Sequence, residues 1–292
     1  MPQKLLTLPQ SGIRITPADS YRPPRANAEK HLEALLEEWP LPQGKQFGTY
    51  LIPHNSRFSD IARVVECTVF ERFFGNTAEC MAEAYAPYEE HSLFLLVIDQ
   101  VQRRPAGTIR IILPSGKGLK SLNDISGAPL HISAEMIEQH HGITNARRCW
   151  DIGTLAVHKE YRAAGSDHMV SLMLYGHLFA LLRRRCIQHM VTILDRHAYA
   201  QLVDVLGAPI VPLAGSEPFS YLGSESSRAC YAAITTAKAE MEARLASLPT
   251  EVQALLKPYV ARFLYCEDMS ELVEVQEDVE RTGRVPIARL MR

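Results

Sequence analysis

The chain has 292 residues, with 31 Lys and Arg against 33 Asp and Glu, which gives a formal charge of -2. This balance lacks the basic excess of a protein that coats nucleic acid, so we expect no nucleic-acid partner. A hydrophobic fraction of 47% and a charged fraction of 22% are ordinary for a chain that buries a sizeable core, which argues against disorder. The longest apolar runs fall far short of the roughly 20 residues that a membrane span needs, and the first residues lack a secretory signal. We therefore expect no transmembrane segment and a cytoplasmic location.

The first 50 residues are predicted to form an arm, because they contain seven prolines, and proline fixes the backbone and removes an amide donor. One short helix is expected in this arm over 27–39, where apolar residues recur at helical spacing. The same spacing over 58–84 predicts helical structure with a stop at Gly75-Asn76. Two strands follow, over 92–99 and 106–113, and the polar turn between them predicts a hairpin.

Residues 114–148 have a loop-like composition, with at most a short helix over 132–140. After this loop-like stretch we expect a strand over 150–157, a long helix over about 166–184 and a strand over 188–194. A helix over 196–206, strands over 210–213 and 229–235, and helices from Thr236 onward are expected to follow. This order indicates an α+β fold built on a mixed α/β sheet. We divide the chain into an N-terminal arm with a short helix (1–50), a sheet domain (51–235) and a C-terminal helical extension (236–292).

The cysteines and histidines do not predict a metal site. The six cysteines form no Cys-x-x-Cys pair, and the eleven histidines show no His-x-x-x-His arrangement. Closely spaced ligands of these kinds are typical of zinc sites and of redox dithiols, so neither is expected.

The stretch with the most chemical information is the turn between the strand that ends at Val157 and the long helix after it. It reads Tyr161-Arg162-Ala163-Ala164-Gly165-Ser166. Backbone amides at the start of a helix form a site for phosphate or pyrophosphate, and Gly165 lets that backbone come close to a ligand. The alternative is an ordinary strand-to-helix turn in which Gly165 serves only the geometry.

This stretch resembles motif A of the GCN5-related N-acetyltransferase (GNAT) superfamily, in which Arg/Gln-x-x-Gly-x-Gly/Ala binds the pyrophosphate of coenzyme A. From about 58 to 235 the chain resembles one branch of that superfamily, the autoinducer (acyl-homoserine lactone) synthases and the long-chain N-acyl amino acid synthases. The segments that carry the likeness are Phe70-Glu71-Arg72-Phe73-Phe74, Tyr88-Glu89-Glu90, Gly107-Thr108-Ile109-Arg110-Ile111-Ile112-Leu113-Pro114 and Trp150-Asp151-Ile152-Gly153-Thr154-Leu155-Ala156-Val157.

The resemblance implies a GNAT-like acyltransferase fold and an enzyme, an N-acyltransferase. Such a transferase moves an acyl group from an acyl-CoA or acyl-carrier-protein thioester to the amine of an amino acid or a similar small acceptor. The thioester is a co-substrate, and no permanently bound cofactor is implied. Monomer and homodimer are both left open, because the C-terminal extension could pack against a second copy of the chain.

The same resemblance implies site residues. Asp151 would orient or deprotonate the amine, with Glu89 or Glu90 as alternatives, because the reaction must remove a proton from an ammonium. Tyr199 would protonate the leaving thiolate. The residues implied at the substrate are Arg72, Arg110, Trp150 and Thr154, and those implied at the donor are Val157, Arg162, Ala163, Ala164, Gly165 and Ser166. The arginines would hold carboxylates through their forked guanidinium groups. The structural alternatives are a pairing of Asp151 with Arg147 or Arg148 and ordinary salt bridges for Arg72 and Arg110.

Three residues depart from the pattern of the relatives. Asp167 stands where motif A has Gly or Ala, Asp151 replaces a Glu, and Thr154 stands where autoinducer synthases carry an Arg. Asp167 would place a carboxylate beside a pyrophosphate, although in the first helical turn it could be a cap residue. Two other functions therefore stay open: a catalytically inactive sensor or scaffold for acyl thioesters, and a short-chain acetyltransferase of a protein or an antibiotic amine.

Overall fold

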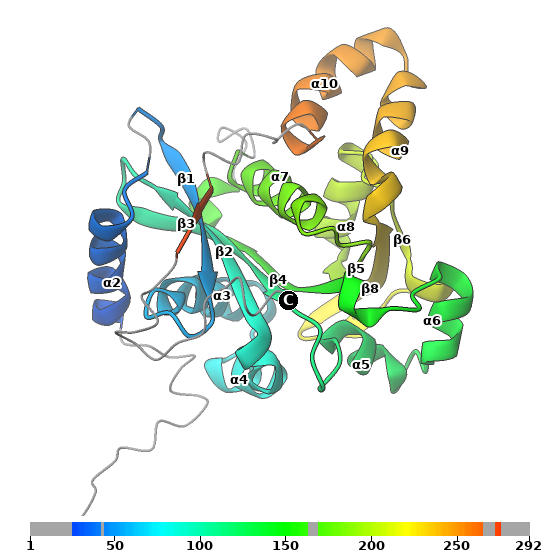
Figure 1. Ribbon diagram of the computed structural model, residues 1–292, viewed down its shortest axis with the longest axis horizontal. Helices are drawn as coiled ribbons and strands as arrows, with labels where there is room; N and C mark the ends of the chain where they lie inside the picture. Colours follow the sequence, from blue (N-terminus) through cyan, green and yellow to red (C-terminus); the bar gives the residue numbers. More distant parts are fainter. Residues whose placement is uncertain (1–24, 42–43, 163–168, 265–271, 276–292) are drawn as a thin grey trace, which may run out of the picture.

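A mixed sheet forms the centre of the molecule (Figure 1). The computed structural model describes residues 25–41, 44–162, 169–264 and 272–275. Over these residues the strands lie in the order β6-β8-β5-β4-β3-β2-β1-β9, and β7 pairs with β8. The strands are β1 Phe47–Pro53, β2 Ser92–Asp99, β3 Arg104–Ile112, β4 Cys149–Val157, β5 His189–Asp195, β6 Ile210–Pro212, β7 Phe219–Tyr221, β8 Ser224–Ala233 and β9 Leu272–Glu274. Both antiparallel and parallel pairs occur, so the mixed α/β sheet expected from the sequence is confirmed.

Helices cover both faces of this sheet. The α-helices are α2 Arg25–Glu38, α3 Ser59–Phe74, α4 Ala78–Tyr85, α5 Lys120–Ser126, α6 Ala134–His141, α7 Met169–Arg184, α8 Arg196–Ala200, α9 Ile234–Ala246 and α10 Thr250–Leu264. The short helical turns are η1 Ala86–His91, η2 Ala146–Arg148, η3 Lys159–Tyr161, the π-turn η4 Gln201–Val205, and η5 Leu213–Gly215. Leu93 and Leu95 of β2 pack in the cluster that contains α7, whereas Phe94 and Leu96 pack in the cluster that contains α3. Because side chains alternate along a strand, α3 and α7 cover opposite faces, as Figure 1 shows.

Helix α3 ends at the position that the sequence predicts. Gly75 adopts the left-handed conformation, with φ of 69°, and its N–H donates to the carbonyl of Glu71. Glycine takes this conformation without a Cβ penalty. Helix α4 then begins after Thr77, whose side chain accepts a hydrogen bond from the N–H of Cys80. The break allows α4 to place Tyr85 against the central strands, where its hydroxyl donates to the carbonyl of Gly153.

The central strands β4 and β5 are neighbours over only part of their length. Their parallel pairing runs from Cys149 with His189 to Ile152 with Thr192. Beyond this point β4 continues to pair with β3, and β5 continues to pair with β8. The ladder between β3 and β4 also passes over Gly153, which is therefore an extra residue in β4, a β-bulge that bends the strand. The sheet is consequently split between the second halves of β4 and β5.

Three strands, β1, β7 and β9, lie in segments that were not predicted to be strands. β1 crosses the domain boundary expected at residue 50 and pairs with β2 along its whole length, from Phe47 with Asp99 to Pro53 with Leu93. β9 has three residues and pairs in parallel with β1. β1 and β9 each depend on a partner strand that is far away in sequence. β1 also lies beside proline-rich segments, so its sequence was not recognised as a strand. β7 pairs with its neighbour β8. Helix α5 lies in the 114–148 stretch that was expected to be loop-like apart from a short helix over 132–140, so that expectation was wrong. The elements β8 and α9 were predicted but start earlier than expected, at Ser224 and Ile234.

In the parts of the chain listed above, no helix is long and apolar enough to cross a membrane.

Candidate active site

A cavity of about 780 Å³ lies where β4 and β5 separate. Its walls come from the split strands and from helices on both faces of the sheet, α3 on one side and α7 on the other. The cavity therefore passes through the sheet, and its parts on the two faces are joined at the gap. We call them the α7-face lobe and the α3-face lobe.

The α7-face lobe is mainly apolar. Its lining residues are Ser171, Tyr175, Leu178, Phe179 and Leu182 of α7, Ile234 and Ala237 of α9, and Phe263 of α10. The rings of Phe179 and Phe263 are stacked, with centroids 5.3 Å apart. The predicted C-terminal extension thus contributes α9 and α10 to one wall of the cavity. Helix α7 serves both the core and the cavity, because its Leu174 and Leu181 are completely buried.

The α3-face lobe carries more polar groups. Its lining residues include Phe70, Phe73 and Phe74 of α3, Tyr85, Thr154, and the hairpin residues Tyr221, Leu222, Gly223, Ser224 and Glu225. The hydroxyl of Tyr221 donates to Asp124 Oδ2 over 2.5 Å and accepts from Lys120 Nζ over 2.6 Å. This lobe therefore offers hydroxyl groups at its wall and charged groups directly behind them.

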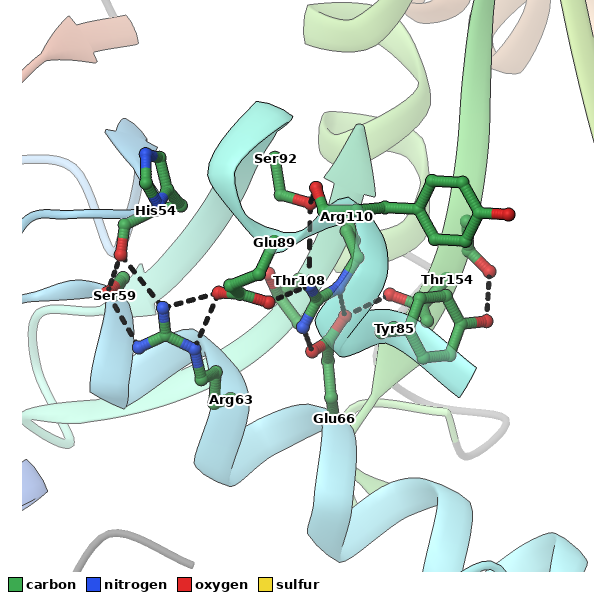
Figure 2. Close-up of polar contacts among 12 residues, drawn as sticks. His54, Ser59, Arg63, Glu66, Tyr85, Glu89, Ser92, Thr108, Arg110 and Thr154 are labelled. Carbon is green, nitrogen blue, oxygen red and sulfur yellow. Dashed lines mark hydrogen bonds and ion pairs between the residues drawn. The ribbon is translucent and has the colours of Figure 1, made fainter. Parts of the chain in front are cut away.

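A network of charged side chains joins α3, η1 and β3 (Figure 2), next to the α3-face lobe that Thr154 lines. Arg110 of β3 binds Glu66 of α3 through two hydrogen bonds, Nε to Oε1 at 3.0 Å and Nη2 to Oε2 at 2.6 Å. Its Nη1 donates to Oε2 of Glu89 over 2.5 Å, and Glu89 also accepts from Arg63. Arg63 in turn donates to Ser59 and to the carbonyl of His54. The network therefore ties α3 and η1 to β3 with each charge matched by an opposite charge.

Thr154 connects this network to the cavity. Its side chain is 3% exposed, it lines the cavity, and its hydroxyl donates to Oε1 of Glu66. A hydroxyl that donates to a carboxylate keeps its lone pairs as acceptors. Thr154 thus presents an acceptor to the cavity with a carboxylate behind it.

Asp151 is completely buried and does not line the cavity. Its carboxylate accepts two hydrogen bonds of 2.6 Å from Ser121, one from the backbone N–H and one from the hydroxyl. Burial raises the pKa of Asp151 to about 6, although the hydrogen bonds from Ser121 and the charge of Lys120 act in the opposite direction. Asp151 therefore holds the start of α5, and its partner is Ser121, not Arg147 or Arg148.

Glu89 and Glu90 lie in different surroundings. Burial acts to raise the pKa of Glu89, but the charges of Arg110 and Arg63 and their hydrogen bonds outweigh it and hold this pKa at about 2. The Glu89 side chain is therefore an ionised carboxylate that is paired with Arg110 and Arg63. Glu90 is exposed at the surface, and neither residue lines the cavity.

Three other predicted residues also lie outside the cavity lining. Arg72 is exposed, with its guanidinium 5.9 Å from the centre of the Phe73 ring. Trp150 is buried in the core cluster that contains α7. Tyr199 is half-buried, and the guanidinium of Arg228 lies 5.2 Å from its ring centre. The structure thus brings together Thr154, Val157 and Arg162 at the cavity and places the remaining described candidates elsewhere.

Val157 and Arg162 lie at the end of β4 where the split is open. Both line the cavity, and Arg162 Nε donates to the carbonyl of Val157 over 2.7 Å. The guanidinium of Arg162 also lies 4.2 Å from the centre of the Phe73 ring. The other motif A residues, Ala163, Ala164, Gly165 and Ser166, lie outside the described residues, as does Asp167.

Sequence reasoning missed Glu66 and Tyr175. Glu66 lies between the apolar residues Val65 and Val69 on the buried side of α3, where an unpaired charge would be costly. That position was a signal for a buried ion pair, but the partner Arg110 is 44 residues away. Tyr175 was visible only as one member of an apolar helical stripe. The helical spacing of that stripe does not show that Tyr175 lines a cavity.

Comparison with known proteins gives fold-level likenesses only. No family model and no curated protein sequence matches the chain. One similar solved structure is a CoA-dependent acyl-homoserine lactone synthase, BjaI, with SAM and isopentyl-CoA (12% identity, TM-score 0.48, covering 82% of this chain and 98% of that one). Another is FeeM, an N-acyl amino acid synthase from uncultured soil microbes (14% identity, TM-score 0.48, 66% and 93%). A third is ribosomal-protein-S5-alanine acetyltransferase from Vibrio fischeri (10% identity, TM-score 0.38, 68% and 98%).

Proposed function

We propose that this chain is an N-acyltransferase that moves an acyl group from an acyl-CoA or acyl-carrier-protein thioester to the amine of an amino acid or a similar small acceptor. The observation that carries this proposal is the cavity that passes through the split between β4 and β5. Two reactants can meet there from opposite faces of the sheet. The resemblance of the turn after Val157 to motif A supports the same reaction.

The donor would enter at the open end of the split, beside Val157 and Arg162. There the edge of β4 that faces β5 has no β5 partner after Ile152. An open strand edge can pair with an extended arm that carries amide groups, as the phosphopantetheine arm of coenzyme A or of a carrier protein does. The apolar α7-face lobe would then take the acyl chain, because burial of its methylene groups is favourable.

The amine would approach through the α3-face lobe, where Thr154 offers its acceptor oxygen. We assign Thr154 to orienting the amine. Glu66, behind it, would accept the proton of the Thr154 hydroxyl while that hydroxyl takes the proton lost by the amine nitrogen. This gives Thr154 and Glu66 the place beside the amine for which the family resemblance implied Asp151. Asp151 acts in this proposal by fixing α5 through Ser121.

The test is thiol release by the purified chain. Acetyl-CoA, octanoyl-CoA, palmitoyl-CoA and the corresponding acyl carrier proteins are offered with a panel of amino acids and other small amines. We expect release that requires both a medium or long acyl donor and an amine. Thr154→Val should lower turnover at least about tenfold, and Thr154→Ser should keep most of it because it keeps the hydroxyl. Absence of thiol release with every donor contradicts the proposal.

One observation favours a second candidate, an inactive sensor or scaffold for acyl thioesters. The carboxylates Asp151 and Glu89 are occupied by other protein groups and lie outside the cavity. A sensor would bind one thioester tightly, and calorimetry would show that binding without turnover for any amine. Consumption of acetyl-CoA in preference to long donors would instead select the short-chain acetyltransferase.

A further inference from the structure

One buried polar atom in the cavity lining has no partner among the described residues. The hydroxyl of Tyr175 on α7 makes no hydrogen bond there, although the side chain is only 5% exposed. Buried tyrosine hydroxyls usually have a partner, because an unsatisfied polar group in a low-dielectric interior is costly. Tyr175 also lines the cavity, and the charges that act on its hydroxyl are those of Asp195 and Arg162, which line the same cavity.

The position of Tyr175 along α7 indicates which atom of a ligand it would meet. Ser171, one turn earlier on α7, is a polar residue of the lining, and the residues that follow in the lining, Leu178, Phe179 and Leu182, are apolar. Tyr175 therefore stands where the lining changes from polar to apolar. In an acyl thioester, the carbonyl oxygen lies at the corresponding change, between the polar arm and the hydrocarbon chain.

We propose that Tyr175 is a catalytic residue whose hydroxyl donates a hydrogen bond to the carbonyl oxygen of the acyl thioester and to the oxyanion that forms from it. This inference rests on the proposed acyl transfer and adds a residue to it. In the reaction the amine nitrogen bonds to the carbonyl carbon, and the π electrons of the carbonyl move to its oxygen. When the intermediate collapses, the C–S bond breaks and the thiolate leaves with the electron pair. The proton lost by the amine balances the proton gained by the thiolate, and Tyr175 keeps its own.

The surroundings of Tyr175 suit a neutral donor. Burial raises the pKa of the Tyr175 hydroxyl above its ordinary value, and the charge of Asp195 acts in the same direction, while that of Arg162 opposes it. The hydroxyl therefore stays protonated at working pH. A fixed donor in a site of low dielectric strengthens its hydrogen bond as negative charge develops on the acceptor.

The experiment compares the wild-type chain with Tyr175→Phe, using octanoyl-CoA and whichever amine supports turnover. We expect kcat to fall about 100-fold, the size found when one oxyanion donor is removed, with donor affinity changed less than about threefold. The carbonyl stretch of bound octanoyl-CoA, labelled at its carbonyl carbon, should lie at lower frequency in the wild type than in the variant. This infrared readout requires binding but no turnover.

Tyr259→Phe is the matched control, because Tyr259 is half-buried on α10 and is not part of the cavity lining. It should keep the wild-type kcat. Loss of the Tyr175 hydroxyl should leave the melting temperature equal or higher, since the hydroxyl has no hydrogen-bond partner to lose within the part of the chain that the structure describes.

Three results would overturn the inference. The first is an active wild type with an unchanged kcat and carbonyl frequency in Tyr175→Phe. The second is a loss confined to donors with a hydroxyl on the acyl chain, which would assign the contact to that oxygen instead. The third, an inactive wild type, would remove the proposed function itself and is distinguished by the wild-type assay alone.

Discussion

Arg110 and Glu66 form a doubly hydrogen-bonded ion pair in which neither side chain has any exposed surface. Removing two charges from water is costly, and the pair compensates through close geometry and through further partners, Glu89 for the arginine and Thr154 for the glutamate. The pair joins α3 to β3 at the place where the α3-face lobe has its polar wall. Stability and the proposed chemistry therefore depend on the same group of atoms.

Arg110→Met should destabilise the protein by about 3–5 kcal/mol, because it leaves Glu66 as a buried charge without its partner. Chemical denaturation at neutral pH measures this. The double variant Arg110→Met with Glu66→Met should recover part of the loss. As a control, Arg103→Ala breaks the exposed pair with Glu33 and should leave the melting temperature unchanged. Equal effects of Arg110→Met and Arg103→Ala would contradict this account of the network.

The pH dependence of stability should carry a contribution from Asp151. Its pKa rises from 3.8 in the unfolded chain to about 6 in the folded one, so the folded state holds the proton more tightly. The stability that this provides is fully present below pH 3.8 and is lost as pH rises through 6, by up to about 3 kcal/mol. Asp151→Asn lacks this titration. The wild-type minus variant difference in unfolding free energy should therefore be larger at pH 4 than at pH 7, and an unchanged difference would show that the Asp151 pKa is not raised.

Phe263 should limit the space available at its end of the α7-face lobe. Phe263→Ala removes the ring that stacks on Phe179, and for a ring that is 9% exposed the expected loss of stability is about 3 kcal/mol. If the lobe holds the acyl chain, the preferred donor should become longer, with each additional methylene that is accommodated worth about 0.8 kcal/mol of binding. Calorimetric titration with a series of acyl-CoA donors measures both the preferred acyl-chain length and the binding free energy gained with each methylene. If the variant prefers the same acyl-chain length as the wild type, the acyl chain does not bind beside Phe263.

Gly223 should tolerate no side chain. It has a φ of +77°, and a Cβ built on it would lie 2.1 Å from the carbonyl oxygen of Phe74. Gly75 also has a positive φ, 69°, but a Cβ there meets nothing within 4 Å. Gly75→Ala should therefore cost about 1–2 kcal/mol from backbone strain alone, whereas Gly223→Ala should cost clearly more because the end of α3 must move. Urea denaturation measures the unfolding free energy of both variants, so it separates the steric clash at Gly223 from the backbone strain that both positions share. Equal losses of unfolding free energy would argue against close contact between the hairpin and α3.

The central elements could be predicted because their signals are local. The apolar run of β2, the alternation of β3 and the stripe of α7 each follow from residues within one segment. The pairing of β1 and β9 is set by partners far away in sequence, which no local pattern describes.

The site, like the fold, could be predicted only where its position depends on local sequence. On a regular strand, residues three apart point to opposite faces, yet Asp151 and Thr154 both point towards the α3 side because the bulge at Gly153 adds one residue. The bulge depends on how β3 pairs with β4. Residue spacing could therefore identify β4 as the strand that carries the site, but not which of its side chains reach the cavity.

The position of β9 has a consequence for variants shortened at the C-terminal side. Leu272–Glu274 covers the outer edge of β1, and Glu274 accepts hydrogen bonds from Arg185 at the end of α7. Without β9, the backbone donors and acceptors on that side of β1 would face solvent as a row of unpaired groups, a template on which a strand of another molecule can add. A chain ending at residue 264 would keep every residue described here as lining the cavity, and we expect it to self-associate for this reason. Loss of solubility in such a truncation would reflect an uncovered sheet edge and would carry no information about acyl transfer.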